Sequence, residues 1–266
     1  MQKTAENSIK RKVSLLVFHC FALPTPQMIK IFKETGTGVH YIIQRNGKIL
    51  SLVEEDKVAR HAGLASWAEF PDSINAKSIG IELQNSQMGN QRYTAIQVKS
   101  LIKLAKEIIK RHGIKACNIV GHSDIAPYRK PDPGKFFPWR ELAKKGIGIW
   151  PEVKNCVSVK SFERTKAVQM LKIIGYNVTD ETAALYAFTM RFMPQKIDVR
   201  SNIIKKEAEV FSFWRGVAVE NAAKKIKEAP KIYPPEAEKL WRDSEILSRI
   251  EQVSDVYKRE RKKKNC

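Results

Sequence analysis

The feature that most constrains this chain is a loop at residues 121–134, rich in proline and glycine, that carries a His, a Lys and an Asp. Three prolines in this loop fix φ and lack a backbone N–H donor, so the segment is not expected to be a helix. The apolar run at 118–120, which precedes it, is typical of a strand. Functional side chains are often presented from a rigid loop at a strand end. His122 and Asp132 are both zinc-binding residue types, so the loop is a candidate metal site.

A third ligand can come from the first apolar run of the chain. Residues 13–18 read Val-Ser-Leu-Leu-Val-Phe and predict a strand that ends at His19. Two His and one Asp leave the fourth zinc position open, which is the pattern of a catalytic rather than a structural site. The alternative is that His19 is a core histidine that binds nothing.

A carboxylate lies inside another apolar run. Residues 78–85, Ser-Ile-Gly-Ile-Glu-Leu-Gln-Asn, predict a buried strand that contains Glu82. Carboxylates are rarely fully buried unless they are paired or coordinate a metal. Beside a metal-bound water, Glu82 would serve as a general base. The alternative is an outward-facing Glu on an edge strand, with Ile81 and Leu83 in the core.

Five segments occur in an order that resembles a known family. They are Phe18-His19, Val39-His40-Tyr41-Ile42-Ile43, Arg60-His61-Ala62-Gly63, Ser78-Ile79-Gly80-Ile81-Glu82, and Gly121-His122-Ser123-Asp124-Ile125-Ala126-Pro127 through Phe137-Pro138-Trp139. The chain resembles AmpD-like N-acetylmuramoyl-L-alanine amidases over about residues 11 to 145. These are type-2 zinc amidases, related to phage T7-type lysozyme and to peptidoglycan recognition proteins.

The resemblance implies a role for each matching residue. His19, His122 and Asp132 match the zinc ligands of the family. Glu82 matches the acidic residue that handles the attacking water, and Lys130 matches the cation that stabilises the oxyanion. Zn²⁺ is therefore the expected cofactor.

The resemblance also implies a substrate groove, to which we assign His61, Trp67 and Asn85. For His61 the alternative is a loop histidine exposed to solvent. Lysozyme-like relatives carry a Tyr just before the His-aromatic pair, where this chain has Val39. Because Glu82 is present, the chain looks like the AmpD branch.

The first 150 residues predict an α/β fold with a mixed central sheet flanked by helices. We expect a helix at 27–34 after a proline, and a hairpin of 39–44 and 48–53 joined by Asn46-Gly47. A longer helix is expected to open with Thr94 and Gln97 in a capping-box pattern and to end at Gly113. His40 is expected to be structural, and His112 to be a charge partner at the end of that helix.

Residues 157–225 predict a small all-α three-helix domain, with helices at 161–174, at about 180–193 and at about 198–223. Over about forty residues it resembles the peptidoglycan-binding domain that follows some AmpD-like catalytic domains. The alternative is a helical buttress that packs on the amidase.

Residues 226–266 predict a basic helical extension with one helix at 236–262. The apolar stripe of this helix could contact a partner, so a homodimer through the helix is one expectation. The stripe consists of Leu240, Trp241, Ile246, Leu247, Ile250 and Val253.

A net charge of +20 predicts attraction to polyanions, which include nucleic acid, anionic lipid and cell-wall polymers. Peptidoglycan or muropeptide fragments are the favoured partner because stem peptides carry carboxylates, and nucleic acid is the alternative through the basic run at 258–264.

No run approaches the ~20 apolar residues of a membrane span. Residues 10–23 imitate a signal peptide, but cleavage would remove His19, so we expect a strand there and a cytoplasmic protein, with the periplasm as the alternative. Nothing in the spacing of the four cysteines demands a disulfide.

The sequence therefore predicts a zinc amidase that cleaves the amide between the lactyl group of N-acetylmuramic acid and L-alanine. It leaves open whether the substrate is the intact wall or a 1,6-anhydro fragment. The alternative is a non-catalytic peptidoglycan-binding protein, against which the full set of five matching site residues argues.

Overall fold

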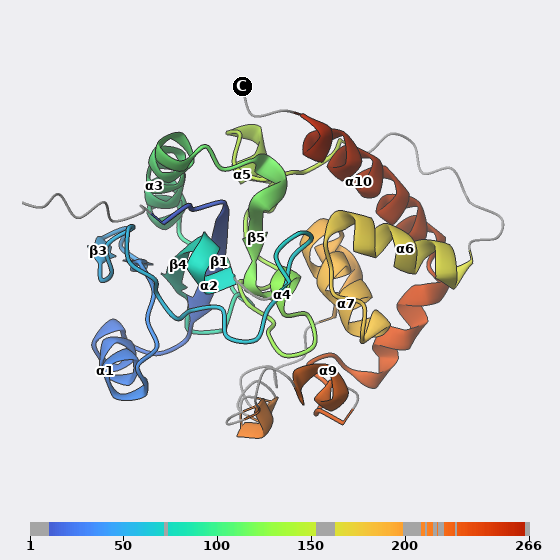
Figure 1. Ribbon diagram of the computed structural model, residues 1–266, viewed down its shortest axis with the longest axis horizontal. Helices are drawn as coiled ribbons and strands as arrows, with labels where there is room; N and C mark the ends of the chain where they lie inside the picture. The colour runs from blue at the N-terminus through green and yellow to red at the C-terminus, as the bar shows by residue number, and fades with distance from the viewer. Residues whose placement is uncertain are drawn as a thin grey trace, which may run out of the picture.

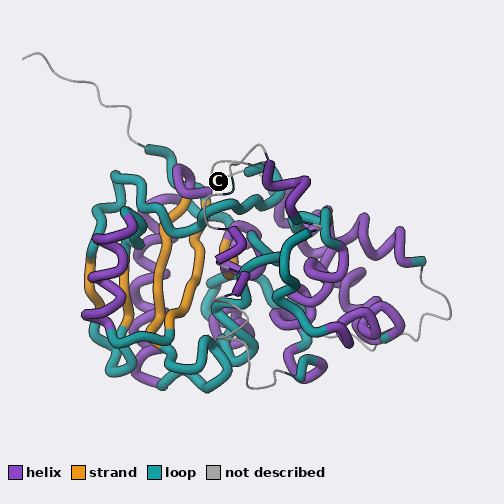
Figure 2. Tube along the Cα trace, turned by 90° about the horizontal axis from the view of Figure 1, so that it is seen from below, coloured by secondary structure: helices purple, strands orange, loops and turns teal. Residues whose placement is uncertain are grey.

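The structure is a computed structural model that describes residues 11–71, 74–152 and 163–198, and residues 209–263 apart from 211, 215–216, 218–220 and 227. A sheet lies on one side of the molecule and a group of helices on the other (Figures 1 and 2). The predicted α/β class with a mixed sheet is confirmed.

The sheet has the strand order β3-β2-β4-β1-β5. β1 pairs in parallel with β4 and β5, β2 pairs in parallel with β4, and β2 and β3 form an antiparallel hairpin. The predicted hairpin is confirmed, although its strands are shorter than expected, and Gly47 in its turn has φ 81°. The strands span β1 Leu15–Phe21, β2 Tyr41–Ile43, β3 Ile49–Ser51, β4 Ser78–Gln84 and β5 Ile119–Gly121.

The helices of the first half cap and cover this sheet. They are α1 Thr25–Thr35, α2 Ile74–Lys77, α3 Ala95–His112, the 3₁₀ turn η1 Ala116–Asn118, α4 His122–Ile125 and α5 Trp139–Lys144. The start of α3 is as predicted, since the Thr94 side chain accepts from the Gln97 N–H at 3.2 Å. The Gln97 side chain does not complete a capping box. It donates instead to the carbonyls of Ile43 and Gln84, which ties α3 to the sheet.

The two faces of the sheet bury different partners because side chains alternate along a strand. Leu16 and Phe18 face α3 and α5 in one apolar cluster. Leu15 and Val17 face the opposite way, into a cluster with Trp67 and the C-terminal helices. We call this second side, which His19 shares by alternation, the site face.

The second half of the described chain is helical. Its elements are α6 Arg164–Ile174, α7 Glu181–Phe192, η2 Pro194–Lys196, α9 Ala222–Lys225, η4 Pro235–Arg242 and α10 Ser244–Lys262. The first two predicted helices are confirmed: Gly175 is the C-cap of α6, and Asp180 is the N-cap of α7, where its carboxylate accepts from the Ala183 N–H at 3.0 Å. Most of the helix predicted at 198–223 lies outside the described residues. We refer to α6, α7 and α10 together as the helical unit.

The prediction of a single helix at 236–262 is wrong. A 3₁₀ helix, η4, ends at Arg242, and α10 starts afresh after Asp243, whose carboxylate accepts from the N–H groups of Glu245 and Ile246. A new cap inside the segment divides it into two elements.

The apolar stripe of α10 is used within the chain. Ile246, Ile250 and Val253 are fully buried in the site-face cluster, and α10 lies along α6 (Figure 1). The stripe is therefore not an open surface for a partner, and homodimerisation stays a prediction.

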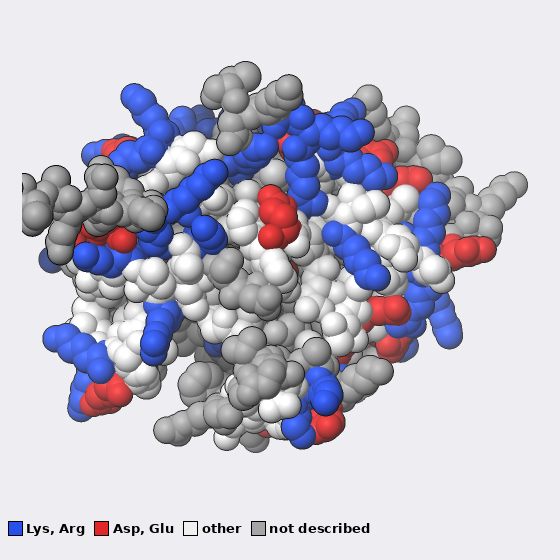
Figure 3. All heavy atoms as spheres, in the orientation of Figure 1, with Lys and Arg blue, Asp and Glu red and all other residues white. Residues whose placement is uncertain are grey.

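The charges of the protein also follow the fold. Lys and Arg side chains gather along the edge of the molecule where α5 and the end of α10 lie (Figure 3). Within the part of the chain that the structure describes, no helix has both the length and the apolar character needed to cross a membrane.

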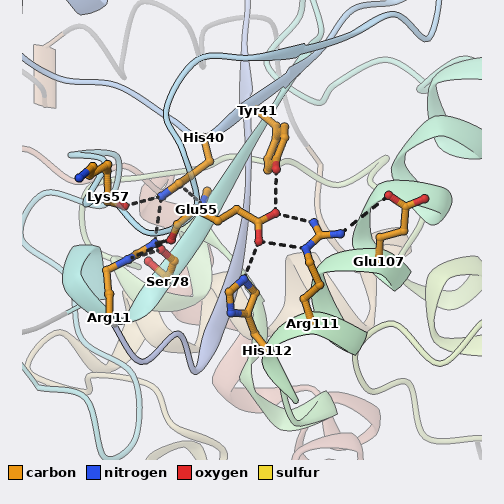
Figure 4. Close-up of polar contacts among 10 residues, drawn as sticks. Arg11, His40, Tyr41, Glu55, Lys57, Ser78, Glu107, Arg111 and His112 are labelled. Atoms are coloured by element: carbon orange, nitrogen blue, oxygen red, sulfur yellow. Dashed lines mark hydrogen bonds and ion pairs between the residues drawn. The ribbon is translucent and has the colours of Figure 1, made fainter. Parts of the chain in front are cut away.

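Two of the five histidines have structural partners (Figure 4). His40 is fully buried, and its Nδ1 accepts from the Gly80 N–H at 3.0 Å. His112, at the end of α3, lies 2.5 Å from a carboxylate oxygen of Glu55, which also pairs with Arg111. Both predictions for these histidines are confirmed.

Candidate active site

Three of the predicted site residues bring their ligand atoms together. Nδ1 of His19, near the end of β1, lies 2.9 Å from Nδ1 of His122 at the start of α4. Oδ2 of Asp132 lies 3.2 Å from the His122 nitrogen and 3.4 Å from the His19 nitrogen. All three side chains are buried. The structure thus forms a candidate metal site from residues far apart in the sequence.

The loop that carries two of these ligands is partly helical, contrary to the sequence prediction. α4 makes a single turn that starts at His122 and ends before Pro127. The turn forms because the Asp124 carboxylate accepts from the Gly121 N–H at 2.8 Å, and the proline then stops it. The Ser123 N–H donates to the Asp132 carbonyl at 2.7 Å, which fixes the two ligand segments against each other.

Outer hydrogen-bond partners reach the second nitrogen of both ligand imidazoles. Nε2 of His122 lies 3.1 Å from the Ala62 carbonyl, which can only accept, and 3.3 Å from Nη2 of Arg129, which can only donate. A metal on Nδ1 requires the proton on Nε2, and the Ala62 carbonyl is the acceptor for it. Arg129, which sequence reasoning missed, holds that carbonyl by donating to it and to the Leu64 carbonyl.

A second chain of hydrogen bonds does the same for His19. The Ser78 hydroxyl donates to the Ile74 carbonyl at 2.6 Å, so it accepts from Nε2–H of His61 at 3.0 Å. Nδ1 of His61 then accepts from Nε2–H of His19 at 2.9 Å. In this order Nδ1 of His19 carries no proton, and its lone pair points at the other two ligands.

His61 is therefore a partner of a ligand, and neither an exposed loop residue nor shown to line a groove. Its ring lies against Gly80 of β4, where an added Cβ would approach the ring to 2.6 Å. Only a residue without a side chain leaves this room on the site face. The Gly between Ser78 and Glu82 was the signal in the sequence that could have located this partner.

The protonation states suit a metal. Burial lowers the pKa of His19, and burial lowers the pKa of His122 to about 3, so both rings are neutral near neutral pH. Burial alone would raise the pKa of Asp132, but His122 and His19 outweigh it and hold the pKa of the carboxyl well below its ordinary value. Two neutral imidazoles and a carboxylate are the forms that bind a cation.

This arrangement passes a simple test of fit for a metal. With Nε2–H of His122 on the Ala62 carbonyl and Nε2–H of His19 on His61, the two Nδ1 lone pairs and a carboxylate oxygen face one another in a buried space. Three acceptors so close are stabilised only by a cation or a proton among them. The donor set of two imidazoles and one carboxylate matches that of catalytic zinc.

The two proposed catalysts lie near this centre. Glu82 of β4 is in register with His19 of β1, and it is largely buried. Its neighbours Ile81 and Leu83 point into the apolar cluster with α3. Because side chains alternate along a strand, the Glu82 side chain lies on the site face. Burial is the largest cause of the lowered pKa of His19, and the positive charge of Lys130 lowers it further. Lys130 therefore lies near this ligand. Glu82 is therefore not an edge-strand residue, because β4 lies inside the sheet.

Trp67 is a core residue in this structure, and its burial gives no support to the substrate-groove assignment. Its side chain is fully buried, its indole N–H donates to the Cys117 carbonyl at 3.1 Å, and its ring packs edge-on against Tyr176 and Tyr257. The large aromatic surface serves the core between the sheet and the helical unit.

Asn85 also has a structural role, and its contacts give no support to the substrate-groove assignment. It is fully buried just after β4, where its Oδ1 accepts from the N–H groups of Gln87 and Gly89 and its Nδ2 donates to the Gln91 carbonyl. These bonds shape the turn that leads from β4 to α3. These bonds use Oδ1 twice and one of the two N–H groups of Nδ2, and the side chain is fully buried.

Comparison with known proteins fits this geometry. Residues 9–135 match the family model described as N-acetylmuramoyl-L-alanine amidase. The N-acetylmuramoyl-L-alanine amidase AmiD of Escherichia coli is 33% identical over 210 residues, which span 69% of this chain and 76% of AmiD. This chain belongs to the N-acetylmuramoyl-L-alanine amidase family.

Solved structures extend the likeness to the helical unit. AmiD of E. coli in complex with the substrate anhydro-N-acetylmuramic acid-L-Ala-D-gamma-Glu-L-Lys superposes with a TM-score of 0.69 at 25% identity, over 96% of this chain and 93% of that one. AMPDH3 from Pseudomonas aeruginosa gives a TM-score of 0.69 at 25% identity, over 97% of this chain and all of that one. The amidase therefore shares its whole described architecture, including the helices after the sheet, with these relatives.

Proposed function

We propose that this amidase is zinc-dependent and hydrolyses the amide between N-acetylmuramic acid and L-alanine in peptidoglycan or muropeptides. The observation that supports it most directly is the buried group of His19, His122 and Asp132 beside Glu82, in a chain of this family. The substrate printed for the AmiD complex makes soluble anhydro-muropeptides the first substrates to test.

Zinc held by the two Nδ1 atoms and the Asp132 carboxylate would supply a Lewis acid for the amide carbonyl and for a water molecule. Glu82, on the site face beside His19, accepts the proton of the attacking water and passes one to the leaving amine. Lys130 stabilises the negative charge that develops on the carbonyl oxygen, a contribution of about 3–4 kcal/mol for a well-placed donor. His61 and Ala62 keep the ligand rings in the tautomers that leave Nδ1 free.

The metal is tested by chelation and restoration. The purified protein should contain close to one zinc per chain, lose activity when a chelator removes it and regain activity when zinc is added. Full activity in a chelator-stripped sample with no residual metal would refute the zinc mechanism. Soluble anhydro-muropeptides and purified sacculi, digested in parallel and followed by mass spectrometry, would show which substrate is cleaved at the amide to L-alanine.

The two catalysts are separated from the ligands by their effect on zinc content. Glu82→Gln and Lys130→Ala should retain zinc and lose most of kcat, because their interactions are made in the transition state. Glu107→Gln and Lys106→Ala are matched controls on the exposed side of α3 and should leave both zinc and kcat unchanged. If Glu82→Gln turned over near the wild-type rate, Glu82 would not be the base. If it lost zinc, Glu82 would belong to the metal site.

The cytoplasmic location stays a prediction from the sequence. The interpretation of the helical unit as a wall-binding domain also stays untested, and we favour a supporting role, because its helices share one apolar cluster with Leu15 and Val17 of the sheet.

A further inference from the structure

A buried ion pair joins the helical unit to the turn that carries a metal ligand. Nη1 of Arg191, in the last turn of α7, lies 2.5 Å from Oδ2 of Asp124 in α4. Both side chains are 1% exposed. The pair therefore bridges the second half of the chain to the active-site half with no solvent around it.

Asp124 uses both carboxylate oxygens on this bridge. Oδ2 also accepts from the Gly121 N–H at 2.8 Å, and Oδ1 accepts from the Tyr176 hydroxyl at 2.6 Å. Arg191 makes a second bond, from Nη2 to the Ile119 carbonyl of β5 at 3.2 Å. Arg191 of α7 thus holds β5 and the α4 turn through one bond each, and Tyr176, in the loop between α6 and α7, adds a second bond to the turn.

The bridge ends one residue away from a metal ligand. Gly121, whose N–H the carboxylate holds, is bonded directly to His122. On the other side Gly121 is so tightly packed that an added Cβ would lie 2.6 Å from Pro133, the neighbour of Asp132. A shift of the α4 turn would therefore move both His122 and Asp132.

The Arg191 guanidinium also lies 3.9 Å from the centre of the Trp139 ring, and an added Cβ on Gly121 would come within 3.3 Å of that same ring. The cation, the ring and the turn thus form one packed layer under His122. A planar guanidinium suits this place because it can stack and donate in two directions at once, which an ammonium cannot.

Stability alone does not account for such a pair. A buried ion pair often contributes no more to folding than apolar groups of the same volume, because both charges lose their hydration. What it does impose is a fixed geometry on the groups it bonds. Here those groups are the end of β5 and the peptide next to a metal ligand.

We propose that Arg191 and Tyr176 are positioning residues for the metal centre, and that they act through Asp124 on His122. The helical unit is then part of the metal site and not a separable wall-binding module. This inference rests on the metal centre of the proposed function, but not on the identity of the substrate.

The test measures zinc affinity and the absorption spectrum of the Co²⁺-substituted protein, both on the full chain and both independent of activity. Arg191→Met should weaken zinc binding by about tenfold or more, the size seen when outer partners of metal ligands are lost. It should also alter the Co²⁺ d–d bands, because the ligand geometry changes. Arg191→Lys should restore part of the affinity, and Tyr176→Phe, which removes one hydroxyl and keeps both charges, should change the spectrum with a smaller loss.

The matched control is Arg249→Met. Arg249 is a second buried arginine of the helical unit, but it donates to the Pro151 carbonyl and stacks near Trp150, away from the metal loop. This variant should lose stability and keep the zinc affinity and the Co²⁺ spectrum of the wild type. Should Arg191→Met fail to fold, Tyr176→Phe alone carries the test through its spectrum.

Wild-type affinity and spectrum in both Arg191→Met and Tyr176→Phe would overturn the inference. So would an equal loss of zinc affinity in Arg249→Met, because the effect would then be general destabilisation. A wild-type protein that binds no zinc would instead refute the metal centre of the proposed function.

Discussion

Replacing His61 with alanine should weaken zinc binding without removing any ligand. His61 receives the Nε2–H of His19 at 2.9 Å and passes its own Nε2–H to Ser78 at 3.0 Å. Without His61, the His19 ring is free to carry its proton on Nδ1, where Asp132 lies 3.4 Å away and can accept it. A proton at that place competes directly with the metal.

The size of the effect follows from the burial of His19. Its side chain is 1% exposed, so an N–H group left without an acceptor costs about 1–3 kcal/mol unless water replaces the lost imidazole. At 1.4 kcal/mol for each factor of ten, this is about a 5- to 140-fold loss of affinity, which brackets the usual effect of an outer partner on a metal site.

The measurement is a zinc competition titration against a chromophoric chelator at a fixed, mildly alkaline pH. His61→Asn should recover much of the affinity, because an amide oxygen can take the place of Nδ1 as acceptor, whereas His61→Ala should not. His112→Ala removes a histidine that pairs with Glu55 and not with a metal ligand, and it serves as the control. If His61→Ala bound zinc within twofold of the wild type, the hydrogen-bond chain from β4 would have no part in the metal site.

Two further predictions concern residues that the structure places in the core. Trp67→Ala should lower the free energy of unfolding by about 3–5 kcal/mol and leave KM for muropeptides unchanged, measured by urea denaturation and by initial rates; a raised KM would return Trp67 to the substrate groove. Burial lowers the pKa of His40 to about 4, so the unfolded chain takes up the proton first. The stability from His40 is therefore present above pH 6.5 and is lost as the pH falls towards 4, up to about 3 kcal/mol. His40→Asn, whose amide oxygen can still accept from Gly80, should show a smaller loss of stability over that range, and an identical pH profile would contradict the assignment.

Local rules in the sequence predicted the elements that depend on neighbours in the chain. The Asn46-Gly47 turn, the Thr94 cap of α3 and the Asp180 cap of α7 each rest on contacts within four residues. The ligand set was also accessible, because His19 ends an apolar run and His122 and Asp132 share one loop.

Contacts across the fold were not accessible in the same way. The bond between His61 and His19 joins residues 42 positions apart, and it depends on the sheet order that puts β4 beside β1. Trp67 and Asn85 lie next to motifs of the site in the sequence. Their neighbouring residues do not distinguish a core aromatic or a turn-forming amide from a substrate contact. The α4 turn was missed because its cap is Asp124, three residues into the turn, which satisfies the Gly121 N–H from within.

The sequence predicted a boundary between a catalytic and a C-terminal domain between residues 150 and 157. In the structure the two parts share one apolar cluster across this boundary. A chain ending near residue 155 would lose Tyr176 and Tyr257, on which the fully buried Trp67 packs, and the whole site-face cluster would face water. At about 1.5–3 kcal/mol for each large apolar side chain exposed, four such losses approach the about 5–15 kcal/mol that stabilises a typical domain. It would also lose Arg191, the partner of Asp124. We therefore expect the shortened chain to be poorly folded and to hold no zinc, as judged by circular dichroism and metal analysis. A shortened chain that is folded, carries stoichiometric zinc and cleaves soluble muropeptides at the wild-type rate would show instead that the sheet and its metal site form an independent domain.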